Sequence, residues 1–205
     1  MSKNKDMKSM LKDAVVLFLI TLIAGLALGF VYELTKEPIR IQEEKAIQKA
    51  CQAVFPQAEK FDVAEYTLSS ALTNRLKENG VTIGTVFEAK DSSDNCMGYV
   101  VESTSSEGYG GKITLYAGIT KDGMLNGISI LSIAETPGLG MNAQNVLVPQ
   151  FEKVPATMFT YTKTGSTSES EIDAISGATI TTEAVVNAVN GAVTVVTEEM
   201  MKGGN

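Results

Sequence analysis

Asp173-Ala174-Ile175-Ser176-Gly177-Ala178-Thr179, continued by Ile180-Thr181-Thr182, is the stretch that decides how the end of the chain folds. It closes a polar loop and leads into a run whose apolar residues recur at helical spacing, namely Val185, Val189, Ala192 and Val196. We expect a closing helix over residues 182–201, with Thr181 or Thr182 as its N-cap. Thr179 would then lie directly before a helix start, where free backbone N–H groups and the helix dipole favour a phosphate.

Small and polar residues surround Thr179. Ser176 can add a hydroxyl donor, Gly177 lets the backbone approach a ligand closely, and Ala178 leaves room beside the acceptor hydroxyl. An unaided threonine hydroxyl is a weak nucleophile and needs a base or a metal, and this chain contains no His. We therefore do not expect Thr179 to attach a group to itself unaided. A plain helix cap is the alternative interpretation of the same residues.

Two glycine-rich loops precede this stretch. In the first, Glu107-Gly108-Tyr109-Gly110-Gly111-Lys112, the glycines permit close backbone approach and Tyr109 presents an aromatic ring. In the second, Glu135-Thr136-Pro137-Gly138-Leu139-Gly140-Met141, the Pro137-Gly138 pair predicts a type II turn. Each loop by itself is typical of an ordinary turn, so only their combination with the Thr179 stretch indicates a ligand site.

The remainder of the chain predicts an α+β fold with an antiparallel sheet flanked by helices. Pro38 should interrupt a helix or start a new one. Helices are expected over 41–55, with one face formed by Ile47, Ala50, Cys51 and Val54, over 69–79, and briefly over 142–146. Strands are expected over 96–104, 112–120, 124–134 and 172–175, and over a first run in which Val81, Ile83, Thr85 and Phe87 share one face.

Residues 14–32 read AVVLFLITLIAGLALGFVY and contain no charge. At about 1.5 Å rise per residue, this run approaches the ~30 Å hydrocarbon core of a membrane. Four lysines precede it: Lys3, Lys5, Lys8 and Lys12. The positive-inside rule then predicts a cytoplasmic N-terminus at 1–13, a single transmembrane helix at 14–32 and an extracytoplasmic domain at 33–205. A cleaved signal peptide and a buried helix of a soluble protein are the alternatives, disfavoured by the missing cleavage pattern and by the length.

Charge and composition exclude several classes of function. The net charge of −7 argues against a nucleic-acid partner, because phosphate binding needs clustered Lys and Arg. The absence of His removes the commonest metal ligand, and two cysteines, Cys51 and Cys96, cannot hold a four-cysteine iron–sulfur cluster alone. We therefore predict no metal site and no catalytic acid–base residues. After Tyr32 the chain carries 13 Lys and Arg against 22 Asp and Glu, a net charge of −9.

In this order, the membrane anchor, the Gly-Tyr-Gly-Gly loop, E-T-P-G-L-G and D-x-x-S-G-A-T resemble the FMN-binding domains of the Rnf and Nqr respiratory complexes. The resemblance spans essentially the whole chain. It implies that a flavin transferase links FMN to Thr179 through a phosphoester, with Thr181 and Thr182 as fallback acceptors. It also implies that Asp173 either is recognised by the transferase or stabilises the turn of the Asp173–Thr179 stretch. The other residues implied at the flavin are Ser176, Gly177, Ala178, Glu135, Thr136, Gly138, Leu139, Gly140, Tyr109, Gly110 and Gly111.

The compact chain favours the G subunit of Rnf over the C subunit of the Na⁺-translocating NADH:quinone reductase, which resembles a longer version with insertions. The resemblance then implies an electron-relay subunit in a bacterial or archaeal cell membrane. Its complex would couple ferredoxin:NAD⁺ oxidoreduction to Na⁺ or H⁺ translocation, with flavin- and iron–sulfur-carrying subunits as partners and no independent catalysis by this chain. A stand-alone anchored flavoreductase and a membrane-tethered, non-redox binding or assembly module are the alternatives from other classes.

Overall fold

The computed structural model describes residues 3–201, and the chain divides into two compact units between Lys45 and Ala46. The first unit consists of the N-terminal part of helix α1 (Lys3–Val54), which is long and apolar enough to cross a membrane. No residue in its most apolar window is buried. The Thr21 hydroxyl donates to the carbonyls of Leu17 and Phe18 at 3.1 and 3.0 Å. This bonding hides its polarity within the helix, as a membrane-spanning segment requires.

Helix α1 does not break at Pro38, so the expected interruption is wrong. A proline inside a helix removes one backbone hydrogen bond, but here side-chain ion pairs join residues on the two sides of Pro38. The Arg40 guanidinium pairs with Glu37 and Glu44 at 2.5 and 2.6 Å, three and four residues apart, which is the spacing that supports a helix. Because the helix continues, the compact part of the expected 33–205 domain begins only at Ala46.

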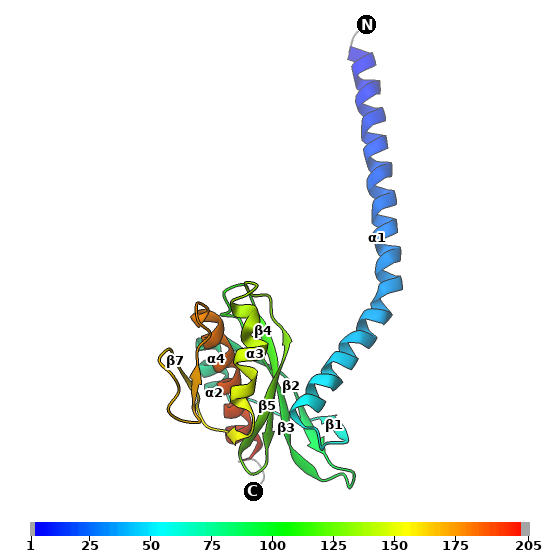
Figure 1. The fold of residues 1–205 in the computed structure, drawn as a ribbon. Helices are drawn as coiled ribbons and strands as arrows, with labels where there is room; N and C mark the ends of the chain where they lie inside the picture. The colour runs from blue at the N-terminus through cyan, green and yellow to red at the C-terminus, as the bar shows by residue number, and fades with distance from the viewer. Residues whose placement is uncertain (1–2, 202–205) are drawn as a thin grey trace. The chain divides into compact units, whose positions relative to one another are not determined.

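The second unit is built on a six-stranded antiparallel sheet in which every strand pairs with its neighbour in the sequence. Its strands, coloured cyan to yellow in Figure 1, are β1 (Lys60–Val63), β2 (Val81–Lys90), β3 (Cys96–Ser105), β4 (Ile113–Thr120), β5 (Met124–Ser132) and β6 (Val154–Pro155). A separate parallel pair joins β7 (Thr160–Thr162) to β8 (Glu171–Asp173). The predicted meander and the α+β class are confirmed.

One strand departs from simple alternation. The pairing of β2 with β3 shifts between Ile83 and Val86, so a bulge forms there. Beyond it, Val86 faces one core and Phe87 packs on the opposite side of the sheet. The expected single face over 81–87 is therefore wrong after Ile83, because one extra residue reverses the direction of all later side chains. The Glu102 carboxylate fills the bulge and accepts the N–H of Thr85 at 3.0 Å.

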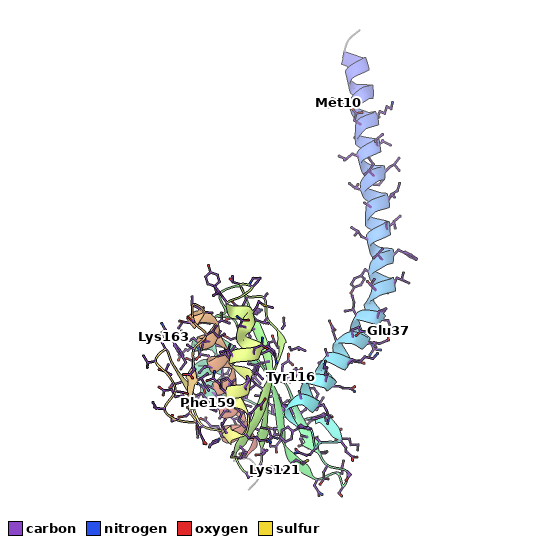
Figure 2. The ribbon with its side chains drawn as sticks, in the orientation of Figure 1. Met10, Glu37, Tyr116, Lys121, Phe159 and Lys163 are labelled. Atoms are coloured by element: carbon purple, nitrogen blue, oxygen red, sulfur yellow. The ribbon has the colours of Figure 1, made fainter. Side chains whose placement is uncertain are left out.

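Helices cover both faces of the sheet. Helix α4 (Thr179–Val195) packs its expected apolar stripe on one face, with Val185, Val189 and Ala192 fully buried. The end of α1 packs on the other face, where Cys51 and Val54 contact the cluster around Tyr116. Figure 2 labels Tyr116 on this side and Phe159 on the side of α4. Both cysteines are free thiols; Cys51 is buried and Cys96 is half-buried.

The short elements follow local sequence signals. Helix α2 (Ser70–Glu78) begins at an N-cap, Ser69, whose hydroxyl accepts the N–H of Leu72 at 3.4 Å, and it stops before Gly80, which adopts a left-handed φ of 63°. The expected helix near 142–146 appears as three short pieces: η1 (Gly140–Asn142), α3 (Ala143–Val146) and η2 (Val148–Phe151). A π-helical turn, η3 (Val196–Met200), follows α4. These pieces carry the chain from β5 to β6 and from α4 to the last described residue.

Candidate functional site

A cavity of about 520 Å³ lies where the three loops singled out in the sequence meet. This volume falls within the range of small-molecule sites, roughly 300–1,000 Å³. The lining residues come from three segments far apart in the chain: Tyr109; Glu135, Thr136, Leu139 and Gly140; and Gly177, Ala178, Thr179, Ile180 and Thr181. The fold therefore brings the two glycine-rich loops together with the Thr179 stretch at one site.

Glu135 connects the first two walls of this cavity. Its side chain is only 7% exposed, and its Oε1 atom accepts the backbone N–H of Gly110 at 3.2 Å. A Cβ atom on Gly110 would collide with the carbonyl oxygen of Ala134, so only glycine lets the two loops touch. Gly110 thus shapes the site without lining it.

The second loop forms the predicted type II turn. The Leu139 N–H donates to the Thr136 carbonyl at 3.1 Å, and Gly138 has a φ of 78°, as that turn requires. A Cβ atom on Gly140 would lie 2.6 Å from Thr181 Oγ1 and 2.9 Å from Glu135 Oε2. Glycine at this position therefore lets the loop pack directly against the start of α4.

Helix α4 begins at Thr179 and not at Thr182, which corrects the expected boundary. Its N-cap is Ala178, which makes no side-chain capping hydrogen bond, so neither Thr181 nor Thr182 is the cap. Both are buried within the first turn, 1% and 0% exposed. The physical reason is that the Thr182 hydroxyl makes two hydrogen bonds inside the protein. It accepts the N–H of Ile175 at 3.1 Å and donates to the Ala178 carbonyl at 3.0 Å.

Thr179 is consequently the half-buried first residue of an uncapped helix, and it lines the cavity. The first N–H groups of a helix have no partner within the helix and carry the positive end of its dipole. The two hydroxyls expected as fallback acceptors are buried, and that of Thr182 is already engaged. The accessible hydroxyl at this helix start therefore belongs to Thr179.

Comparison with known proteins agrees with this arrangement. Residues 108–194 match the FMN-binding domain family, and residues 1–54 match the RnfG N-terminal region. The chain is 32% identical to the G subunit of the Na⁺-translocating ferredoxin:NAD⁺ oxidoreductase complex of Acetobacterium woodii, over 90% of each chain. It is 34% identical to the G subunit of the proton-translocating ferredoxin:NAD⁺ oxidoreductase complex of Clostridium ljungdahlii, over 96% of this chain and 97% of the relative.

The chain belongs to the family of Rnf complex G subunits. A third relative, the G subunit of the ion-translocating oxidoreductase complex of Methanosarcina acetivorans, is 31% identical over 92% of this chain and 95% of its own. NqrC of Shewanella oneidensis, a solved structure, is 22% identical with a TM-score of 0.44 and covers 52% of this chain and 53% of its own. All three walls of the cavity lie within the matched FMN-binding domain.

Five residues expected at the flavin do not line the cavity: Asp173, Ser176, Gly138, Gly110 and Gly111. Ser176 is exposed beside it. The Asp173 carboxylate accepts the N–H and hydroxyl of Ser166 at 2.6 and 3.4 Å, and so holds the loop before β8. The Asp173 carboxylate therefore has a structural partner in this loop.

Two residues near this site were not among those expected at the cofactor. Gln150 in η2 holds the backbone of Asp173 with both ends of its amide: Oε1 accepts the N–H at 2.7 Å and Nε2 donates to the carbonyl at 3.2 Å. Ile180 lines the cavity and is half exposed. Only its place directly after Thr179 could have suggested it, whereas Gln150 is distant in the sequence and is identified by contact alone.

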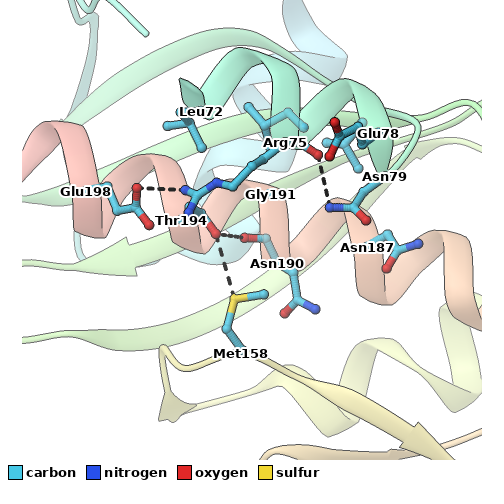
Figure 3. Close-up of a pocket in the computed structure, with 12 residues that line it drawn as sticks. Leu72, Arg75, Glu78, Asn79, Met158, Asn187, Asn190, Gly191, Thr194 and Glu198 are labelled. Carbon is cyan, nitrogen blue, oxygen red and sulfur yellow. Dashed lines mark hydrogen bonds and ion pairs between the residues drawn. The ribbon is translucent and has the colours of Figure 1, made fainter. Parts of the chain in front are cut away.

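A second cavity of about 540 Å³ lies between α2 and α4 and contains none of the expected site residues. Figure 3 shows that several of its polar groups pair with one another. The Arg75 guanidinium pairs with Glu198 at 2.7 Å, and the Thr194 hydroxyl donates to the Asn190 carbonyl at 2.7 Å. Since these groups already have partners, the cavity at Thr179 is the better candidate for a cofactor site.

Proposed function

We propose that this chain is the electron-relay subunit of a membrane complex that couples ferredoxin:NAD⁺ oxidoreduction to ion translocation, and that FMN is bound to it through a phosphoester on Thr179. The relatives named as G subunits of ferredoxin:NAD⁺ oxidoreductase complexes match nearly the whole chain, which supports the complex. The observation that carries the covalent site is the position of Thr179, at the uncapped start of α4 and in the wall of the cavity.

The residues present fit FMN. The free N–H groups and the positive dipole end of α4 would favour the negative charge of a phosphate esterified to Thr179. Gly177, with a φ of 77°, and Gly140 leave space that a side chain would occupy. Leu139, Ile180 and Tyr109 offer apolar and aromatic surfaces to a flat ring.

Attachment requires a separate flavin transferase as a maturation partner. Within residues 3–201, no side-chain base is hydrogen-bonded to the Thr179 hydroxyl, so this chain does not activate it. In the proposed step the Thr179 oxygen forms a bond to the FMN phosphorus of FAD, the bond to the AMP phosphate breaks and AMP leaves. The hydroxyl proton passes to a base of the transferase.

The role of the chain's own residues is to tether and orient the cofactor. When bound, FMN supplies one- and two-electron redox chemistry. A Thr179 ester would hold its phosphate end and prevent loss, while the loops around Glu135 and Tyr109, which line the cavity, would position the ring. Helix α1 anchors the protein in the membrane, and the four lysines before its apolar run support a cytoplasmic N-terminus and an FMN domain outside. Catalysis then belongs to the assembled complex.

Replacing Thr179 tests the covalent site. The full chain is co-expressed with a flavin transferase, denatured and examined for in-gel fluorescence and for a mass gain of one FMN less a water. We expect both signals in the native chain and in Thr179→Ser, which keeps a hydroxyl, and neither in Thr179→Val. Thr157→Val serves as a matched control, because Thr157 is exposed, lies outside the cavity lining and is not part of the D-x-x-S-G-A-T motif.

Two results would contradict the proposal. A native band that stays dark in the presence of active transferase would show that the chain carries no covalent flavin. Fluorescence that survives Thr179→Val would move the ester to another residue.

A further inference from the structure

The side-chain amide of Gln150 takes the place of a neighbouring strand beside β8. Its Oε1 atom accepts the N–H of Asp173 at 2.7 Å, and its Nε2 atom donates to the carbonyl of the same residue at 3.2 Å. Two opposite residues of an antiparallel sheet exchange the same pair of hydrogen bonds. On the other side of β8, the Ala174 N–H donates to the Thr162 carbonyl of β7 at 2.8 Å. The end of β8 is therefore held on both sides, by β7 and by one side chain.

Gln150 lies at the end of the segment that continues the second wall of the cavity. Gly140 lines the cavity and begins η1, after which α3 and η2 lead directly to Gln150. Leu147 and Phe151 of this segment are fully buried, which fixes it to the core of the second unit. The Gln150 Nε2 atom also donates to the carbonyl of Val146 at 2.7 Å, so the amide is oriented by its own segment. Gln150 thus connects the second wall to the backbone that leads into the third.

The loop that leads to the third wall, residues 174–178, is fixed at its two ends by different side chains. At its far end, the Thr182 hydroxyl makes the two hydrogen bonds described above. At its start, the Gln150 amide holds both backbone groups of Asp173. Because Thr179 follows this loop directly, the two supports together set the position of the Thr179 backbone relative to the second wall.

We propose that Gln150 is a positioning residue for the cofactor: it keeps the second and third walls at a fixed separation and so holds the ring of an FMN attached to Thr179 inside the cavity. The inference rests on the proposed function. The phosphate end of this FMN would move with the third wall, whereas Leu139 on the second wall would contact its ring. A site holds its ligand in one geometry only when the residues around it are themselves fixed by hydrogen bonds and packing.

Asn190 provides a matched control for removing the Gln150 amide. Its Oδ1 atom accepts the N–H of Phe159 at 2.8 Å and its Nδ2 atom donates to the Phe159 carbonyl at 2.9 Å, directly before β7. Gln150→Met and Asn190→Leu therefore remove the same pair of backbone hydrogen bonds from half-buried positions, at opposite ends of the β7–β8 pair. Gln150→Glu is a third variant, whose carboxylate keeps an acceptor for the Asp173 N–H but cannot donate to the Asp173 carbonyl.

Hydrogen exchange followed by mass spectrometry, on the full chain in neutral detergent micelles without flavin, reports how often residues 174–178 open. A net hydrogen bond is worth about fivefold in an equilibrium constant, so Gln150→Met should speed exchange in this loop by about fivefold to about 25-fold. We expect Gln150→Glu to speed it as well, and Asn190→Leu to change it by less than about twofold, because the two sites share no hydrogen bond. Equal acceleration in Gln150→Met and Asn190→Leu would overturn the proposal.

An attached flavin supplies a readout that a purely structural role would not change. After co-expression with a flavin transferase, the time-resolved fluorescence anisotropy of the flavin is compared between the chains, with each signal normalised to the flavin content measured by mass. A ring held in the cavity rotates with the whole protein. We therefore expect a rapidly depolarising component to grow in Gln150→Met and Gln150→Glu but not in Asn190→Leu. Identical decays in all chains would show that Gln150 does not position the flavin.

Failure of this inference can be separated from failure of the proposed function. A native chain whose denatured band carries no flavin fluorescence, with active transferase present, overturns both. A fluorescent band together with unchanged hydrogen exchange in Gln150→Met overturns the role of Gln150 alone.

Discussion

Removing the Thr182 hydroxyl should open the loop that presents Thr179. This hydroxyl accepts the Ile175 N–H and donates to the Ala178 carbonyl, so it closes the Ser176–Ala178 loop from inside the protein. Thr182→Val keeps the shape of the side chain but leaves the buried N–H of Ile175 without a partner. An unsatisfied buried donor costs about 1–3 kcal/mol. For a compact unit of this size, about 2 kcal/mol lowers Tm by roughly 4–8 °C.

The assay combines thermal unfolding followed by circular dichroism with in-gel flavin fluorescence after transferase treatment. We expect Thr182→Val to lower both Tm and flavin incorporation. Thr182→Ser keeps both loop hydrogen bonds and should restore incorporation, although loss of the buried methyl costs roughly 1 kcal/mol. Thr197→Val is the matched control, since its hydroxyl only donates to the helix carbonyls of Val193 and Thr194.

The Thr182 reasoning is refuted if Thr182→Val is as stable as the native chain to within about 0.5 kcal/mol, the usual range for harmless surface changes. It is equally refuted if Thr182→Ser loses as much incorporation as Thr182→Val. Either result would mean that the two hydrogen bonds of the Thr182 hydroxyl do not hold the Ser176–Ala178 loop in place.

Two other perturbations follow from the structure. Gly140→Ala forces a Cβ against Thr181 and Glu135, so it should cost about 1–3 kcal/mol of stability and reduce flavin incorporation. In Gly138→Ala the new Cβ meets no atom within 4 Å, so this variant should lose stability through its positive φ but retain flavin incorporation. Equal flavin incorporation in the two variants, measured by mass, would contradict this. Burial raises the pKa of the Cys51 thiol to about 12 from its ordinary value of 9.0, so between these two pH values only the unfolded chain releases this proton. The free energy of unfolding should then fall with rising pH by up to about 1.4 kcal/mol per pH unit. Urea unfolding of Cys51→Ala should show a smaller fall per pH unit over the same range. An equal pH dependence in Cys51→Ala and the native chain would mean that the buried thiol does not cause it.

The elements of this fold were largely predictable, because their signals are local. The uncharged run at 14–32, the Ser69 cap of α2 and the turns between β2, β3, β4 and β5 each depend on neighbouring residues. Two of the wrong expectations, in β2 and at the start of α4, arose where packing within the folded domain overrides the local pattern, whereas at Pro38 the helix continues over ion pairs three and four residues apart. The bulge in β2 exists because Glu102, from the next strand, fills it, and the start of α4 moves to Thr179 because Thr182 is drawn into the core.

By itself, the sequence determined the membrane anchor, the four central strands β2 to β5 with the helices before and after them, and the three loops with chemistry suited to FMN, since spacing, caps and turns act over a few residues; it did not predict the short strands β1, β6 and β7. Only the tertiary structure decided that these loops meet in one cavity, that Glu135 is buried between two of them, and that Gln150 holds the backbone of Asp173. Such contacts join residues that are far apart in the chain. They form only once the sheet and α4 have packed, and no local pattern encodes them.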